Sequence, residues 1–301
     1  MGATSLPTVV VSVGPRCDNA CLTCTPMETR RRLGGKLGGA VYLQKMQELM
    51  SVARHEGARR VVLTGGEPTL HNGILDAVLY AKSLGYKEIE LHTNGRRLAQ
   101  ERFGRDIVRA GVTMFLVSLH GPRPEVHDAI SGVPGSFLET LEGLRSLARL
   151  GRAATVEHCL SASNLDCVAE TAGLLRREGV ASVRYLLWEK FGADGAVAAS
   201  FAPDGKVLAP LRRAVFLGLE GGGKVEIAGI PPCVLGDLAP YWSPTSERPC
   251  AWEVLPPNLG PECSRCVHAA VCPGPPAEYT RRFGWSEFAP VVAPASRPSR
   301  R

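Results

Sequence analysis

The sequence predicts an α/β protein: a partial (β/α)6 TIM-like barrel followed by a small metal-binding extension rich in Cys, Gly and Pro. Two observations support this fold class. Six short runs rich in β-branched residues alternate with longer stretches that place apolar residues at helical spacing. The most unusual motifs of the first half come directly after these runs. Strands that alternate with helices indicate a parallel sheet with right-handed crossovers, whose chemistry lies at the C-terminal ends of the strands.

The predicted strands and helices alternate along roughly the first 190 residues. Strands are expected at 8–13, 59–65, 88–95, 112–121, 153–160 and 182–189, and helices at 41–57, 73–86, 97–110, 136–150 and 165–178. An open doubly wound sheet is the alternative arrangement of the same units. In both arrangements the loop after residue 13, the "GGEPT" after 64, the "TNG" after 92 and the "SLHG" after 117 share one edge of the sheet.

The composition changes after about residue 195, where Gly and Pro become dense and Cys residues return. Such a segment lacks the apolar residues for a core of its own and is typical of a domain held together by metal. We therefore expect a core at 1–195, a metal-binding extension at 196–288 and a disordered basic tail at 289–301.

Charge and hydropathy limit the partners of the protein. The 301 residues are 45% hydrophobic and 21% charged, as in globular proteins, and no run approaches the roughly 18 apolar residues of a membrane span. No secretory signal is recognisable, so we expect a cytoplasmic protein without a membrane partner. Much of the net charge of +6 lies in residues 29–36 and 296–301. These read as a solvated loop and tail, with an anionic partner as the alternative; no nucleic-acid-binding motif accompanies them.

Ten Cys residues are many for a protein in a reducing compartment, where thiols more often bind metal than form disulfides. Cys17, Cys21 and Cys24 follow the first strand with C-x3-C-x2-C spacing. Three ligands leave a fourth position open, whereas structural zinc closes all four. An iron–sulfur cluster with one iron free of protein ligands can bind a small molecule there. Zinc completed by His55 is the alternative.

This loop and two further motifs resemble the radical S-adenosylmethionine (radical SAM) family over roughly residues 8–190. The second motif is "TGGEPTL" at 64–70, and the third is the "VSLHGPRPEVHDAISGVPGSF" region at 117–137. The resemblance implies that Cys17, Cys21 and Cys24 hold a 4Fe–4S cluster whose open iron binds SAM. It further implies that Gly65 and Gly66 let the backbone approach the methionine part of SAM and that Glu67 accepts a hydrogen bond from its ammonium group. Further expected SAM contacts are Asn94, Ser118 and His120, and Asn164 is an additional candidate.

The second Cys set resembles the SPASM and twitch extensions of that family. The resemblance implies one auxiliary 4Fe–4S cluster on Cys250, Cys263, Cys266 and Cys272, with Cys233 as the alternative to Cys250. Pro276 stands where a full SPASM tail carries another Cys. Zinc is the general alternative for four thiols with a C-x2-C core.

The implied reaction is reductive cleavage of SAM to a 5′-deoxyadenosyl radical that abstracts a substrate hydrogen. We expect the substrate to be a peptide or protein, with a small-molecule dehydrogenase as the alternative and a non-catalytic zinc- or iron-binding module as the second. Expected partners are a flavodoxin or ferredoxin as reductant and a separate peptide-recognition protein. Catalytic side chains are not identified; the candidates are Cys159, Cys233, Trp188 and Glu189. For Cys159 and Cys167 the default interpretation is burial as small apolar residues.

Overall fold

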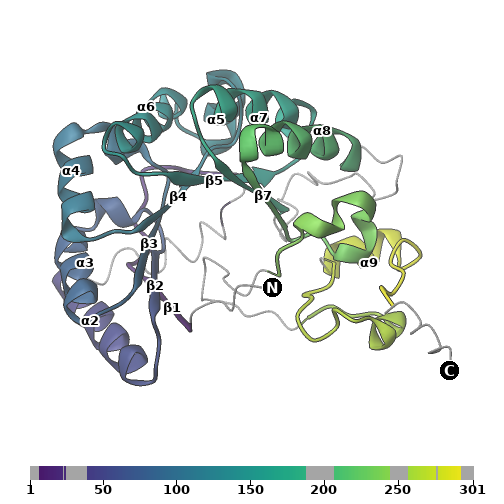
Figure 1. The fold of residues 1–301 in the computed structure, drawn as a ribbon, viewed down its shortest axis with the longest axis horizontal. Helices are drawn as coiled ribbons and strands as arrows, with labels where there is room; N and C mark the ends of the chain where they lie inside the picture. Colours follow the sequence, from purple (N-terminus) through teal and green to yellow (C-terminus); the bar gives the residue numbers. More distant parts are fainter. Residues whose placement is uncertain are drawn as a thin grey trace, which may run out of the picture.

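The computed structural model describes residues 7–22, 24, 39–187, 207–244, 257–275 and 277–292. Its centre is a seven-stranded, wholly parallel sheet whose strands follow one another in chain order. The strands are β1 Thr8–Ser12, β2 Arg60–Thr64, β3 Glu88–Thr93, β4 Met114–Ser118, β5 Ala154–Leu160, β6 Ser182–Leu187 and β7 Lys224–Ala228. Figure 1 shows the sheet as an open arc with helices along its outer side. The predicted α/β partial barrel is therefore confirmed.

All but the last of the described helices fill the connections between successive strands, and the last follows β7. The helices are α2 Gly39–His55, α3 Ile74–Ser83, α4 Glu101–Ala110, α5 Pro124–Ser131, α6 Ser136–Arg149, α7 Val168–Arg177, α8 Leu208–Leu219 and α9 Ala277–Phe283. Short 3-10 turns complete several loops, among them η1 Pro68–Leu70, η2 Arg96–Ala99, η3 Leu165–Cys167, η5 Pro232–Val234 and η7 Pro261–Arg265. In the described part of the chain, no helix is long and apolar enough to cross a membrane.

The sequence pattern predicts six strands, and the seventh is a finding of the structure. Strand β7 and helix α8 lie in the Gly- and Pro-rich region expected to belong to the extension, yet β7 pairs with β6 from Ser182↔Lys224 to Leu186↔Ala228. The sheet thus continues past residue 195, while the division at that residue remains a prediction. The chain after β7 stays attached to this edge, because Ser243 N donates to Ile227 O at 2.9 Å.

The two faces of the sheet differ in chemistry. Successive strand residues point to opposite faces, and one set, including Leu63, Leu91 and Val117, is fully buried against the helices. Burying each such side chain stabilises the fold by roughly 1.5–3 kcal/mol. The other set points to the inner, concave side and includes charged residues such as Glu90 and Arg184. The helices therefore anchor the sheet, and the inner face is left for polar functions.

Candidate functional site

The Cys loop leaves the C-terminal end of β1 and carries Cys17, Cys21 and Cys24, all reduced and half-buried. Cys24 N donates to Cys21 O at 3.1 Å, which folds the second half of the loop into a turn. Asn19 N donates to Cys17 Sγ at 3.3 Å. A backbone N–H directed at sulfur stabilises the thiolate form, which is the form that binds metal. The loop is therefore chemically suited to the predicted ligand role.

Gly65 and Gly66 fasten the second βα loop to the Cys loop. Gly66 N donates to Gly14 O and Glu67 N donates to Arg16 O, both at 2.7 Å. A Cβ on Gly66 would lie 2.1 Å from Arg16 O. Gly65 adopts φ +134°, and a Cβ there would lie 2.8 Å from Gly14 O. Both glycines are thus required by the approach of the Cys loop itself; their expected contact with SAM remains a prediction.

The carboxylate of Glu67 is buried, with 2% of the residue exposed, and joins the ends of β2 and β3. Its Oε1 accepts hydrogen bonds from Thr69 N at 3.0 Å, Thr69 Oγ1 at 2.7 Å and Thr93 Oγ1 at 2.6 Å. Its Oε2 accepts from Asn94 N at 2.7 Å. Burial raises the pKa of Glu67 even though these donors act against the rise. A ligand ammonium would have to share this carboxylate with four protein donors.

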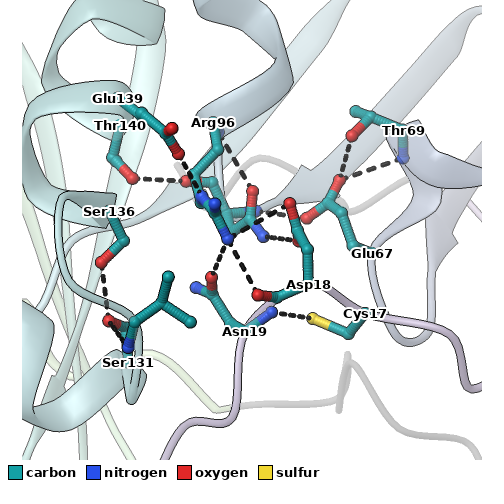
Figure 2. A network of polar contacts seen from close by, with 12 residues as sticks. Cys17, Asp18, Asn19, Glu67, Thr69, Arg96, Ser131, Ser136, Glu139 and Thr140 are labelled. Carbon is teal, nitrogen blue, oxygen red and sulfur yellow. Dashed lines mark hydrogen bonds and ion pairs between the residues drawn. The ribbon is translucent and has the colours of Figure 1, made fainter.

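Arg96 holds the Cys loop from the start of η2. Its Nη1 donates to Asp18 O at 2.9 Å and to Asn19 Oδ1 at 2.8 Å, and its Nε donates to Glu139 on α6. Figure 2 shows the guanidinium group between these three partners. Nothing in the sequence pattern singles out this residue, because Arg96 and Asp18 are 78 positions apart. The arrangement links the Cys loop to the loop after β3 and to helix α6.

The other expected SAM contacts have different surroundings. Asn94 is half-buried, and its Nδ2 donates to Asp18 Oδ1 at 2.7 Å, so it also braces the Cys loop. Ser118 is the half-buried last residue of β4. His120 is 4% exposed and stacks on His127 with ring centres 5.5 Å apart. Burial, and then the neighbouring histidines, lower the pKa of His120 well below its usual range, so its ring is neutral.

Asn164 and the thiols of Cys159 and Cys167 are buried and packed or hydrogen-bonded within the fold. Asn164 Nδ2 donates to Cys159 O at 2.8 Å and to His120 O at 3.0 Å, which closes the loop after β5. Cys167 is buried, and its Sγ donates to Asn164 O at 3.3 Å. Cys159 instead lies on the inner face in a small apolar cluster with Leu186 and Ala228. Of the two, only Cys159 faces the interior of the barrel.

The structure brings four thiols of the extension together. Cys233, Cys263, Cys266 and Cys272 line one hollow whose empty space is about 390 Å³, including solvent at its mouth. Gly274 N donates to Cys272 Sγ at 3.3 Å, the same N–H to sulfur contact that Cys17 receives. Burial and the nearby thiols raise the pKa of Cys233 to about 11. Cys250, Trp188 and Glu189 lie outside the described residues.

Within the described ranges, no three His, Cys, Asp or Glu side chains are grouped so that they could hold one metal ion. An iron–sulfur cluster makes a different demand, because each of its Cys ligands binds a separate iron.

The comparison with known families agrees with this geometry. Residues 11–175, more than half of the chain, match the Radical SAM superfamily. The chain belongs to this superfamily and is an enzyme of that class. Membership implies SAM and a 4Fe–4S cluster as cofactors, and it sets aside the non-catalytic module.

Curated relatives match part of the chain. A probable GTP 3′,8-cyclase of Thermococcus kodakarensis is 32% identical over 139 residues, which cover 46% of this chain and 43% of that protein. An AdoMet-dependent heme synthase of Oleidesulfovibrio alaskensis is 25% identical over 181 residues, which cover 60% of this chain and 45% of that protein. The match covers less than half of the length of either relative.

Solved structures share the fold. SuiB of Streptococcus suis bound to S-adenosylmethionine has a TM-score of 0.55 and 15% identity, covering 74% of this chain and 47% of SuiB. A radical SAM methyltransferase from Sphaerobacter thermophilus has a TM-score of 0.50 and 20% identity, and the match covers 74% of this chain and 66% of the methyltransferase. At these identities the likeness concerns the fold alone.

Proposed function

We propose that this enzyme cleaves SAM reductively and abstracts a hydrogen atom from a peptide or protein substrate. The Cys loop carries the proposal, because three thiols stand at the C-terminal edge of the sheet on a loop fastened by Gly66 and Arg96. When bound, the 4Fe–4S cluster supplies the electron that splits SAM into methionine and a 5′-deoxyadenosyl radical. The reducing cytoplasm and a flavodoxin or ferredoxin as electron donor fit this chemistry.

The protein's own residues would hold the cluster and orient SAM. Cys17, Cys21 and Cys24 would ligate the cluster, and the N–H of Asn19 would stabilise the Cys17 thiolate. Ser118 and Asn94, half-buried at the ends of neighbouring strands, are proposed as polar contacts to SAM. Gly65, Gly66, Glu67 and His120 complete the proposed SAM site, with His120 acting as a neutral group.

A peptide substrate is favoured by the fold. SuiB, whose fold this chain shares, is also known bound to its precursor peptide SuiA, in a structure with a TM-score of 0.52 and 14% identity that covers 74% of this chain and 49% of SuiB. A separate peptide-recognition protein would fit this proposal. A small-molecule substrate is the second candidate, because the GTP 3′,8-cyclases are the relatives with 32% sequence identity.

We further propose one auxiliary 4Fe–4S cluster in a SPASM- or twitch-like extension. Its ligands would be Cys233, Cys263, Cys266 and Cys272, because these four thiols line the same hollow. The proposal takes Cys233 as the fourth ligand; Cys250, the other residue that the sequence leaves open, lies outside the described residues. Four protein ligands would leave no open iron, which suits electron transfer better than substrate binding.

The test is the iron and sulfide content of anaerobically reconstituted protein, combined with a dithionite-driven assay for 5′-deoxyadenosine. We expect about eight irons per chain and deoxyadenosine formation. Replacing Cys17, Cys21 and Cys24 together by Ala should abolish deoxyadenosine and leave about four irons on the extension. Deoxyadenosine formed by the triple variant would overturn the proposed site.

A further inference from the structure

The inner face of the sheet carries charged side chains below the Cys loop, although both faces of a parallel sheet are usually apolar. Two groups interact across neighbouring strands. Arg60, Glu90 and His92 form one group on β2 and β3. Glu157, Arg184 and Glu226 form the other on β5, β6 and β7, with Glu157↔Arg184 and Arg184↔Glu226 as register pairs. The proposed function uses none of these residues.

Glu90 is fully provided with partners. Its Oε2 accepts from Arg60 Nε at 3.0 Å and from Arg60 Nη2, and its Oε1 contacts His92 Nε2 at 2.9 Å. Burial alone would raise the pKa of Glu90, but His92 and Arg60 outweigh it and lower the pKa to about 2. This carboxylate therefore remains charged and paired.

Glu157 is buried to the same degree without such partners. Within the described part of the chain, its carboxylate has no hydrogen bond, and the nearest cation is Arg184 Nη1 at 3.9 Å from Oε2. Arg184 is engaged elsewhere, because its Nε donates to Glu226 Oε2 at 3.1 Å. Burial raises the pKa of Glu157. A buried carboxylate with one distant partner is costly unless something else supplies donors.

His92 presents a second acceptor without a partner. Because the ionised Glu90 can only accept, His92 Nε2 carries the proton and donates to it. In the tautomer that carries its proton on Nε2, Nδ1 is the acceptor of the His92 ring. Among the described residues His92 Nδ1 has no hydrogen-bond partner; the atom is buried, and the side chain is 8% exposed. His92 pairs in register with Leu116 on β4, and Ser118, two residues further along β4, pairs with Glu157.

An apolar layer lies between these acceptors and the Cys loop. Cys159, Leu186 and Ala228 pack together on the inner face, each two residues beyond the charged residue of its own strand. This layer is therefore nearer the C-terminal ends of the strands. Glu157 keeps 9% of its side-chain surface accessible beneath it. A ligand that enters from the Cys loop would meet apolar surface first, and the Glu157 carboxylate and His92 Nδ1 below it.

We propose that the inner face binds a substrate group consisting of an aliphatic stem that ends in an ammonium or guanidinium group. Cys159 and Leu186 would contact the stem, Glu157 would pair with the cation, and His92 Nδ1 would accept a further N–H. The inference rests on the proposed function and narrows its substrate class. The same chemistry occurs in the Lys and Arg side chains of a peptide and in a free alkylamine or alkylguanidine.

The test compares isosteric probes on the anaerobically reconstituted enzyme with SAM present, by calorimetric titration. n-Butylguanidinium should bind at least about 10-fold more tightly than n-butylurea, which has the same shape without the charge. Glu157→Gln should weaken n-butylguanidinium binding by at least about 10-fold. The matched control is Glu88→Gln, the same change on the inner face of β3 at a side chain that is 38% exposed; it should alter affinity less than about 2-fold.

Three results would each overturn the inference. The first is that the wild type binds n-butylurea as tightly as n-butylguanidinium, and the second is that Glu157→Gln binds n-butylguanidinium with unchanged affinity. The third is that the wild type binds neither n-butylguanidinium nor n-butylammonium. If Glu157→Gln does not fold, the comparison of guanidinium with urea on the wild type still decides. A second pair of probes, N-acetyl-arginine N-methylamide and its citrulline analogue, distinguishes a peptide side chain from a free metabolite. If the arginine amide binds more tightly than n-butylguanidinium, the site takes a peptide side chain; if it binds more weakly, the site takes a free metabolite. Deoxyadenosine formation by the wild type tests the proposed function separately, so either can fail alone.

Discussion

A Cβ atom on Gly66 would lie 2.1 Å from the carbonyl oxygen of Arg16, one residue before the first thiol of the Cys loop. The two loops therefore fit together only with glycine at this position. The hydrogen bonds from Gly66 N and Glu67 N to the same segment hold the contact closed. The position of Cys17 depends on this contact between two βα loops.

Replacing Gly66 by Ala should displace the Cys loop. Because a shift of about 1 Å at a reacting centre can cost about 100-fold in rate, we expect deoxyadenosine formation to fall by that factor or more. Rate and iron content are measured on reconstituted protein. Gly173→Ala on α7 is the control, since its Cβ would find only Arg177 Nη1 at 3.6 Å. Unchanged rates in Gly66→Ala would show that the loop tolerates displacement.

Arg96 should act as a positioning residue for the same loop. Arg96→Met removes the donors to Asp18 O and Asn19 Oδ1, and loss of such outer partners typically costs about 10- to 100-fold in metal affinity or activity. The readouts are iron retention against a chelator and the EPR signal of the cluster in a variant that lacks the extension cluster. Arg96→Lys should restore iron retention only in part, because an ammonium group lacks the planar, forked donors of a guanidinium group.

Arg105→Met is the control for Arg96, because Arg105 forms an exposed pair with Glu101 within α4 at 2.8 Å. Such pairs contribute about 0.3–0.5 kcal/mol. Iron retention equal to wild type in Arg96→Met would contradict the positioning role.

The βα series was predictable because each strand and helix has its own local periodicity, as in "RRVVLTG" and the helical stretch after it. Strand β7 was not predicted, because its five residues lie between Gly-rich turns and gain stability only by pairing with β6. The Cys loop was visible from spacing. Its contact with Arg96 was not, since a contact across 78 positions leaves no local pattern. The available signal for the inner face was the alternation of Glu88, Glu90 and His92 in "EIELHT" and the single Glu157 within "ATVEHCL".

Glu90 should make the stability of the protein depend on pH. Its pKa is about 2 in the folded state and about 4.5 when unpaired. A lowered carboxyl pKa contributes stability that is complete above the unfolded value and is lost as pH falls through the folded value. Glu90→Gln should thus lower the free energy of unfolding by about 3 kcal/mol at pH 7, but by only about 1.5 kcal/mol at pH 3.

The measurement for Glu90 is urea unfolding of the metal-free, reduced protein at both pH values. Glu88→Gln is the matched control, because Glu88 Oε2 lies 3.6 Å from Arg60 Nε but its side chain is 38% exposed. It should change the free energy of unfolding by about 0.5 kcal/mol or less. An equal loss at pH 7 and pH 3 would contradict the assignment of the effect to the Glu90 charge.

The last prediction concerns the fourth ligand of the extension. Cys233 follows two Pro residues in η5 and lines the hollow with Cys263, Cys266 and Cys272. In a background where Cys17, Cys21 and Cys24 are all Ala, only the extension can hold iron, so about four irons per chain are expected. Cys233→Ser in this background should lose most of that iron and its visible absorption, because a cluster with one ligand missing is exposed and labile. Cys250→Ser should retain both. If Cys233→Ser keeps its iron and Cys250→Ser loses it, the fourth ligand is Cys250. If both variants lose their iron, the data no longer favour Cys233 over Cys250.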